Sequence, residues 1–160
     1  ARIAQLTNKS NQFNLTTRRF TRAEIQAMAE DGRFVTLYGK LWDKFGDNGV
    51  VSVVIGERGE EGLDVRLWLM SCRVLKRDME YAMMDCLVRR CRALGIRTIR
   101  GYYYPTAKNG MVRDFYAKQG FTRLSEAPDG STVWRLETEG YEEKNHVIAV
   151  EPAEEEENRP

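Results

Sequence analysis

The spacing of hydrophobic and polar positions changes several times along the chain, and the first regular stretch predicts a short helix. Thr21 is a good N-cap residue, and Glu24 three positions later completes a capping box. The pattern predicts a helix over 21–31, ended by Gly32. Its apolar face consists of Ile25, Met28 and Ala29.

An alternating pattern over the next forty residues predicts three strands. They are expected over 34–42, 49–56 and 63–70. Asp47-Asn48-Gly49 predicts the turn between the first two strands, because Asn-Gly accepts the positive φ angles of tight hairpins. One face of the third strand is expected to carry Leu63, Val65, Leu67 and Leu69. Short links between these strands predict an antiparallel meander.

The second half of the chain returns twice to helical spacing. The predicted elements are helices over 79–94 and 109–119 and strands over 96–104, 121–124 and 131–136. Gly95 and Gly120 are expected to close the helices, and Pro128-Asp129-Gly130 the last hairpin. The inner side of the second helix is expected to consist of Met111, Val112, Phe115 and Tyr116. The order of elements predicts an α+β fold with one central sheet and helices on its faces.

The formal net charge of +1 hides an uneven distribution of charge. Residues 137–160 hold nine acids and two bases, whereas the rest of the chain holds 23 bases and 15 acids. A basic body is therefore joined to an acidic stretch. We expect one domain in the 160 residues, with 138–160 as an acidic, mobile tail.

Composition narrows the class of protein further. No apolar run approaches the roughly 18 residues of a membrane span, and no charged-then-apolar leader opens the chain. The cysteines Cys72, Cys86 and Cys91 lack C-x-x-C spacing, which disfavours a disulfide framework and a zinc site. We expect a cytoplasmic protein without a metal site. Since the chain begins at Ala1 without Met, we also expect a domain cut from a larger polypeptide.

Two local motifs resemble the GNAT acyltransferases. Asn109…Phe115-Tyr116…Gly120-Phe121 is similar to that family's N-x-x-A-x-x-x-Y-x-x-x-G-F signature. The stretch 73–78, Arg-Val-Leu-Lys-Arg-Asp, lies where the family has R/Q-x-x-G-x-G/A, the loop around the pyrophosphate of acyl-coenzyme A. The resemblance implies a GNAT-like domain over 21–137, with a mixed, mostly antiparallel central sheet and helices on both faces.

A longer match points to one branch of this fold. Residues 3–19, 43–49 and 71–75 are similar to hallmark segments of FkbH-like proteins, and the resemblance covers 2 to about 136. In that family a phosphatase-like domain of the HAD superfamily precedes a GNAT-like domain. Those proteins load a glyceryl unit from a phosphorylated glycerate donor onto an acyl carrier protein, for methoxymalonyl-type extenders of polyketides. The implied partners are an acyl carrier protein and an upstream HAD-type domain, with residues 1–20 at the join.

The resemblance also implies a set of site residues. Tyr116 matches the position that protonates the departing thiolate, a role that suits a phenol, although core packing is an open alternative. The residues expected to contact coenzyme A or the phosphopantetheine arm of a carrier are Arg73, Val74, Lys76, Arg77, Asp78 and Asn109. Lys76 and Asp78 replace loop glycines, and Asp78 is expected to cap the next helix with its carboxylate. Asn109 is a ligand contact, an N-cap, or both.

Other candidates come from the residue types themselves. His146 is the sole histidine, so acid–base work falls to water or to carboxylates such as Glu57, Asp64 and Glu80. Cys72 is either an acyl-carrying thiolate or a buried, inert residue. The amide-rich cluster expected to bind substrate or the neighbouring domain is Asn8, Lys9, Asn11, Gln12 and Asn14. Asp43 and Asp47 flank Phe45-Gly46 and either bind a hydroxylated substrate or hold the turn.

A basic zone on the predicted helix 79–94 and the strand after it suggests an anionic partner. It consists of Arg89, Arg90, Arg92, Arg97 and Arg100. No nucleic-acid motif accompanies it, so an acidic acyl carrier protein is favoured over nucleic acid. Three functions remain open: an acyltransferase-type domain of a multidomain enzyme, a non-catalytic module that docks the carrier or HAD domain, and an acetyl-CoA-dependent N-acetyltransferase.

Overall fold

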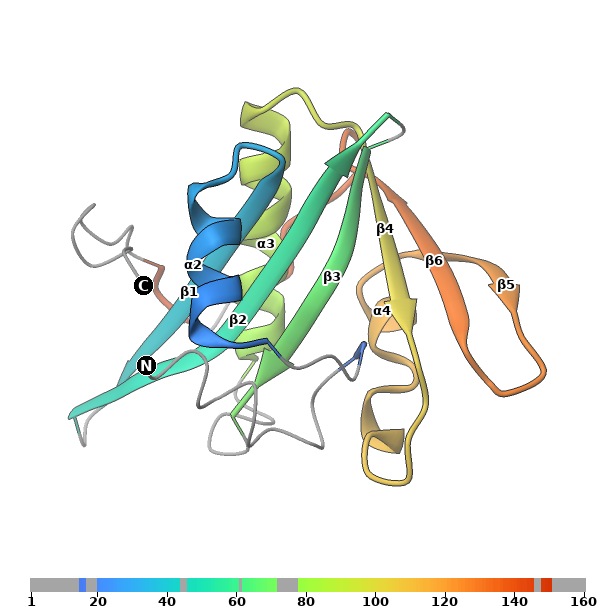
Figure 1. The fold of residues 1–160 in the computed structure, drawn as a ribbon, viewed down its shortest axis with the longest axis horizontal. Helices are drawn as coiled ribbons and strands as arrows, with labels where there is room; N and C mark the ends of the chain where they lie inside the picture. The colour runs from blue at the N-terminus through green and yellow to red at the C-terminus, as the bar shows by residue number, and fades with distance from the viewer. Residues whose placement is uncertain are drawn as a thin grey trace.

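The computed structural model describes residues 15–16, 20–43, 46–60, 62–71, 78–145 and 148–150, with only the backbone of 41–43 and 47–50. The helices are α2 (Arg22–Glu30), α3 (Met79–Ala93), the 3-10 turn η2 (Gly110–Val112) and α4 (Phe115–Lys118). The strands are β1 (Phe34–Asp43), β2 (Gly46–Gly59), β3 (Gly62–Met70), β4 (Thr98–Tyr103), β5 (Thr122–Glu126) and β6 (Thr132–Glu137). Figure 1 shows their arrangement. Within the described residues, no helix has the length and apolar character needed to cross a membrane.

The described strands form one sheet in the order β1-β2-β3-β4-β6-β5. Neighbouring strands are antiparallel except β3 and β4, which run parallel and pair at Leu63–Ile99 and Asp64–Arg100. Beyond these pairs β3 and β4 diverge toward their C-terminal ends (Figure 1). The prediction of a mixed, mostly antiparallel sheet is therefore confirmed.

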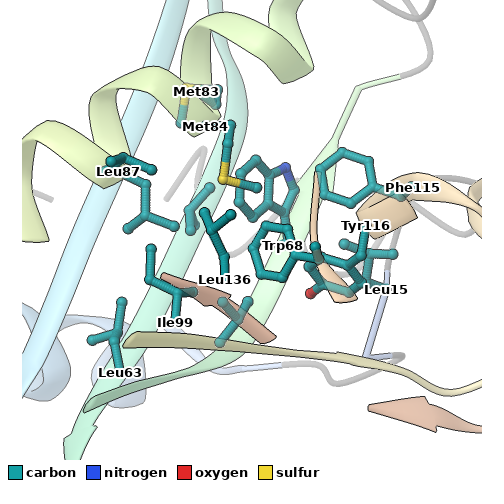
Figure 2. Packing of buried hydrophobic residues seen from close by; sticks show 14 of the residues in the cluster. Leu15, Leu63, Trp68, Met83, Met84, Leu87, Ile99, Phe115, Tyr116 and Leu136 are labelled. Atoms are coloured by element: carbon teal, nitrogen blue, oxygen red, sulfur yellow. The ribbon is translucent and has the colours of Figure 1, made fainter. Parts of the chain in front are cut away.

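Helices cover both faces of the sheet, as the sequence predicts. Val53 and Val54 are both fully buried although they point to opposite faces, because each face has its own hydrophobic cluster. On one face, Ile25 of α2 packs with Val53, Ile55, Leu67 and Leu69. On the other, α3 and α4 contribute Met83, Met84, Leu87, Phe115 and Tyr116 to a larger cluster with Trp68 and Ile99 (Figure 2).

The N-terminus of α2 agrees with the predicted capping box. The Thr21 side chain accepts from the Glu24 backbone N–H at 3.1 Å, and the Glu24 carboxylate accepts from the Thr21 N–H at 3.2 Å. Two N–H groups that the first helical turn leaves without partners are thereby satisfied. The helix ends at the Asp31 C-cap, one residue before Gly32.

The unbroken alternation predicted for β3 is wrong at Arg66. Ile55 of β2 pairs with Leu67 and Gly56 pairs with Val65, so Arg66 has no opposite residue and forms a β-bulge. Because of the bulge, the apolar side chains in the two halves of β3 point to different faces of the sheet. Leu63 and Val65 lie in the α3-side cluster, whereas Leu67 and Leu69 lie in the α2-side cluster.

Two further element predictions need correction. The turn predicted at Asp47-Asn48-Gly49 lies inside β2, because Asp43 already pairs with Gly46 and closes the hairpin. Gly46 supplies the positive φ, at 112°. The helix predicted over 109–119 is broken into η2 and α4, and Met111 is 51% exposed instead of facing inward.

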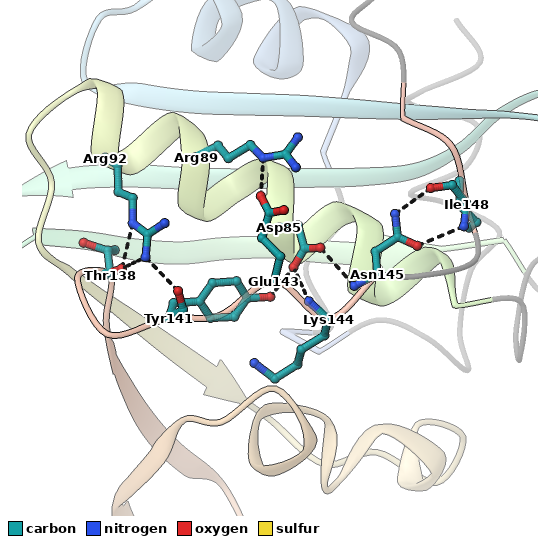
Figure 3. Close-up of polar contacts among 9 residues, drawn as sticks. All are labelled: Asp85, Arg89, Arg92, Thr138, Tyr141, Glu143, Lys144, Asn145 and Ile148. Carbon is teal, nitrogen blue, oxygen red and sulfur yellow. Dashed lines mark hydrogen bonds and ion pairs between the residues drawn. The ribbon is translucent and has the colours of Figure 1, made fainter.

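The expectation of a mobile tail from residue 138 is wrong for residues 138–145, which pack along α3 (Figure 3). The side chain of Asp85 on α3 accepts hydrogen bonds from the Tyr141 hydroxyl and from the N–H groups of Lys144 and Asn145, the latter two at 3.1 and 3.0 Å. The Arg92 guanidinium donates to the Tyr141 carbonyl at 2.8 Å. Tyr141 itself is buried. Residues 151–160 lie outside the described part.

Candidate functional site

The divergence of β3 and β4 creates a feature beside which two of the predicted site residues, Tyr116 and Asn109, lie. We call the space between these strands beyond Asp64 and Arg100 the inter-strand gap. Backbone N–H and C=O groups along its two edges are not paired strand to strand, and buried backbone groups require partners. Something other than the neighbouring strand must therefore satisfy them.

The chain itself supplies those partners through Leu15 and Thr16, which we call the gap segment. The Leu15 N–H donates to the Trp68 carbonyl on β3 at 3.1 Å, and the Leu15 carbonyl accepts from the Tyr104 N–H, just after β4, at 2.9 Å. The Thr16 hydroxyl donates to the carbonyl of Arg66, the bulged residue, at 2.8 Å. Leu15 is 0% exposed and Thr16 is 3% exposed. The gap is thus closed from within.

Tyr116, the predicted general acid, lies in the core beside the gap. Its side chain is fully buried, and its ring packs so closely on β4 that a Cβ on Gly101 would lie 2.3 Å from it. Its hydroxyl faces the Tyr102 carbonyl at 3.5 Å. Burial raises the pKa of Tyr116 well above its ordinary value, so the phenol keeps its proton. The catalytic role of this hydroxyl stays a prediction.

The Asn109 side chain hydrogen-bonds to backbone groups of the loop that follows β4. Its Oδ1 accepts from the Thr106 N–H at 2.7 Å and from the Tyr103 hydroxyl at 3.3 Å, and its Nδ2 donates to the Tyr104 carbonyl at 2.8 Å. The side chain is 0% exposed. Asn109 occupies the N-cap position of η2, but its side chain makes no capping hydrogen bond there. The same loop contains Tyr104, whose backbone N–H donates to the Leu15 carbonyl in the gap.

The N-terminus of α3 differs from the expected anion site. Asp78 occupies the N-cap position but makes no side-chain capping bond, so that expectation is wrong. Its φ of 62° is left-handed, and across the described residues Asp78 is the sole non-glycine with positive φ. The position thus keeps a glycine-like backbone without a glycine. Glu80 adds a second carboxylate in the first turn.

Burial raises the pKa of Glu80 above its ordinary value; Asp78 adds to the effect and Lys118 opposes it. A carboxyl with a raised folded-state pKa contributes stability below its unfolded pKa and loses it as pH rises through the folded value. We therefore expect Glu80→Gln to raise the free energy of unfolding at pH 7 modestly, because the side chain is partly exposed and solvent screens part of the effect. Urea unfolding should show the gain disappearing below about pH 4. Glu142→Gln, at an exposed glutamate, is the control; an equal gain there would contradict the assignment.

Glu57, the predicted carboxylate base, lies in an ion-pair network on the sheet face that bears α2. The Arg66 guanidinium contacts the Glu57 carboxylate at 2.9 Å and Asp64 at 3.8 Å. The Tyr102 hydroxyl donates to Asp64 at 2.8 Å. Beside this network lies a cavity of about 280 Å³ lined by Gly59, Glu60, Gly62, Leu63, Asp64 and Arg100. Glu57 is therefore held in place by Arg66, and its role as a base stays a prediction.

Tyr102 and the gap segment were missed as site residues by sequence reasoning. Tyr102 had a signal, because it alternates with Tyr103 along a predicted strand and so faces the opposite side of the sheet from Tyr103. The gap segment had a weaker one, a lone apolar Leu15 within an amide-rich stretch.

Many predicted site residues lie outside the described part of the chain. They are Asn8, Lys9, Asn11, Gln12, Asn14, Cys72, Arg73, Val74, Lys76 and Arg77. Asp43 and Asp47 are described by their backbone alone, which pairs with Gly46 and Trp42 across the β1–β2 hairpin. Cys86 is half-buried and Cys91 is buried. Burial raises the pKa of Cys91 to about 12, which makes it an unreactive core thiol.

Comparison by sequence finds no matching family model and no matching curated protein. Comparison by structure finds similar folds. The ribosomal-protein-S18-alanine N-acetyltransferase of Escherichia coli has a TM-score of 0.62 at 11% identity, over 90% of each chain. The GNAT domain of S. lividans PAT has a TM-score of 0.64 at 16% identity, over 85% of this chain and 83% of that one. Rv2747 of Mycobacterium tuberculosis, solved with CoA and NLQ, has a TM-score of 0.63 at 13% identity, over 85% and 92%. The single mixed sheet that diverges between β3 and β4, with helices on both faces, is therefore a GNAT fold.

Proposed function

We propose that this chain is a GNAT-fold domain that acts in acyl transfer onto the pantetheine arm of an acyl carrier protein. The acyl group implied by the FkbH-like resemblance is a glyceryl unit. One observation carries the proposal. The gap segment belongs to residues 3–19, the stretch with the longest FkbH-like resemblance, and it is built into the seam of the GNAT sheet. Two residues of this family-specific stretch, Leu15 and Thr16, thus lie where β3 and β4 diverge.

Free coenzyme A, which the fold implies as a cofactor, does not fit the described residues in this conformation. The backbone of Leu15 already forms hydrogen bonds with the Trp68 carbonyl and the Tyr104 N–H, which face into the gap. Asp78 and Glu80 place carboxylates at the N-terminus of α3, where the polyphosphate of the cofactor would meet like charge. A carrier protein instead presents its phosphopantetheine arm together with a docking surface. The proposed reaction therefore starts from a carrier-bound arm.

The docking surface we propose is the exposed basic face of α3. Arg92 is held by carbonyl groups of the segment after β6, and Arg89 pairs with Glu143, so both are already engaged (Figure 3). Arg90 on α3 and Arg97, just before β4, are exposed. An acidic carrier would be attracted to this face, and electrostatic complementarity of this kind sets orientation and association rate.

Calorimetry with a polyketide-type carrier protein tests the proposal. The holo carrier is expected to bind at least about tenfold more tightly than free coenzyme A, because docking raises the local concentration of the arm. Arg90→Glu should weaken carrier binding about 3- to 10-fold through charge repulsion. Arg123→Glu, an exposed arginine on the edge strand β5, is the matched control and should change affinity little. The absence of any holo-carrier signal would overturn the proposal.

A second candidate is a non-catalytic docking module, which the closed gap and the buried hydroxyl of Tyr116 favour. A module of this kind would bind the carrier without supporting glyceryl loading by the HAD-containing protein. A third candidate, an acetyl-CoA-dependent N-acetyltransferase, agrees with the fold. Tight binding of free acetyl-CoA with turnover of an amine would select it over the first two.

A further inference from the structure

The gap segment binds the two diverging strands in the manner of an inserted fragment of strand. One residue, Leu15, uses its N–H toward β3 and its C=O toward the residue after β4. Its side chain joins the same buried cluster as Trp68 and Tyr116 (Figure 2). Two backbone bonds, one hydroxyl bond from Thr16 and a fully buried leucine therefore hold the gap closed.

An extended ligand that carries amide groups would use the same backbone partners. The pantetheine arm has two amides, each with one N–H and one C=O, and can pair with a strand edge as a peptide does. The Trp68 carbonyl and the Tyr104 N–H are already engaged by Leu15. The arm and the gap segment therefore cannot hold these groups at the same time.

We infer that the gap segment is an intramolecular competitor of the pantetheine arm, so that free coenzyme A is excluded and a carrier-tethered arm is admitted. This inference rests on the proposed function and specifies how its site selects its ligand. The apparent affinity of any arm is reduced by the fraction of molecules in which the gap is open. With Leu15 buried and three hydrogen bonds in place, the closed state is favoured on the order of 100-fold or more.

Tethering offsets this competition for a carrier but not for the free cofactor. Once a carrier docks, its arm is present at an effective concentration of roughly millimolar, whatever the concentration of carrier in solution. Displacement of Leu15 would also uncover the neighbourhood of the Tyr116 hydroxyl, which the same cluster now buries. Opening of the gap and access to the predicted general acid are thereby coupled.

The variant Thr16→Val tests the competition with free coenzyme A as the probe. It removes the hydroxyl that donates to the Arg66 carbonyl while keeping the volume of the side chain. Loss of one buried hydrogen bond from the closed state should tighten coenzyme A binding by up to about tenfold. The matched control is Thr138→Val, because Thr138 is also buried and donates to a backbone carbonyl, that of Ile96 at 3.0 Å, away from the gap. Equal affinities for Thr16→Val and the wild type would overturn the inference.

Amide hydrogen exchange supplies a second measurement that does not depend on the variant. In the free protein the N–H groups of Leu15 and Tyr104 should both be protected. Saturation with holo carrier should expose the Leu15 N–H to exchange while the Tyr104 N–H, taken over by the arm, stays protected. A Leu15 N–H that remains protected in the carrier complex would refute the competition but leave the proposed function standing. Failure of the carrier to bind at all would instead refute the proposed function.

Discussion

Replacement of Gly62 by alanine is expected to destabilise the protein by about 3 kcal/mol or more. A Cβ at this position would lie 2.2 Å from the carbonyl oxygen of Thr98, a backbone atom that cannot move without shifting β4. The φ of Gly62 is 136°, a conformation that side chains rarely adopt, so strain adds to the collision. Both effects act at the closed end of the gap, where β3 and β4 pair.

Chemical denaturation of Gly62→Ala beside Gly32→Ala measures this effect. Gly32 has nothing within 4 Å of an added Cβ, so its substitution reports only the ordinary difference between glycine and alanine. The difference between the two variants therefore isolates the close approach of β3 and β4. Similar unfolding midpoints would show that the strands do not converge as closely as described.

The fold was predictable where local periodicity and long-range packing agree. Thr21 and Glu24 lie three positions apart, so a cap visible in the sequence is also present in the structure. The helix predicted over 79–94 agrees with α3, because one apolar face and a closing glycine define it without reference to other elements. Gly95 indeed has a positive φ of 74°.

The features that shape the site depend on partners far away in the sequence. The alternation of apolar residues along 63–69 is unbroken, and the bulge at Arg66 arises only from the register of β3 against β2. The turn in the first hairpin was misplaced for the same reason, since Asn48-Gly49 is a valid turn sequence that strand pairing overrides. Sequence patterns report on single elements, whereas register is a property of pairs.

The contacts that close the inter-strand gap could not be predicted from the sequence. The gap segment belongs to residues 3–19, which the resemblance places at the join with a neighbouring domain, but the bonds of Leu15 to Trp68 and Tyr104 join residues more than fifty positions apart. The burial of Tyr116 follows from Gly101, whose lack of a side chain lets the ring approach β4. The charge pattern led to the wrong prediction of a mobile segment directly after residue 137. The acidic composition of this stretch gave no indication that Tyr141 is buried and holds the segment against α3.

Asp85→Ala is expected to lower the free energy of unfolding by about 3 kcal/mol. Asp85 is 3% exposed and accepts from one hydroxyl and two backbone N–H groups of residues 141–145, so alanine would leave three donors without their acceptor. Release of the segment into water limits the loss, because the freed donors can then bind water at the expense of exposing Tyr141. Release of the segment can be measured separately, because it predicts faster hydrogen exchange of the Lys144 and Asn145 amides.

Asp129→Ala provides the comparison, because Asp129 also accepts a backbone N–H, that of Ser131 at 2.9 Å, but in the exposed turn between β5 and β6. Its loss should lower the free energy of unfolding far less than the loss of Asp85, since water replaces the carboxylate. The free segment would also release Arg92 and separate Glu143 from Arg89, making the α3 face more basic. Asp85→Ala should therefore bind the acidic carrier more tightly while being less stable. Weaker carrier binding would mean that the segment after β6 is part of the docking surface and does not cover it.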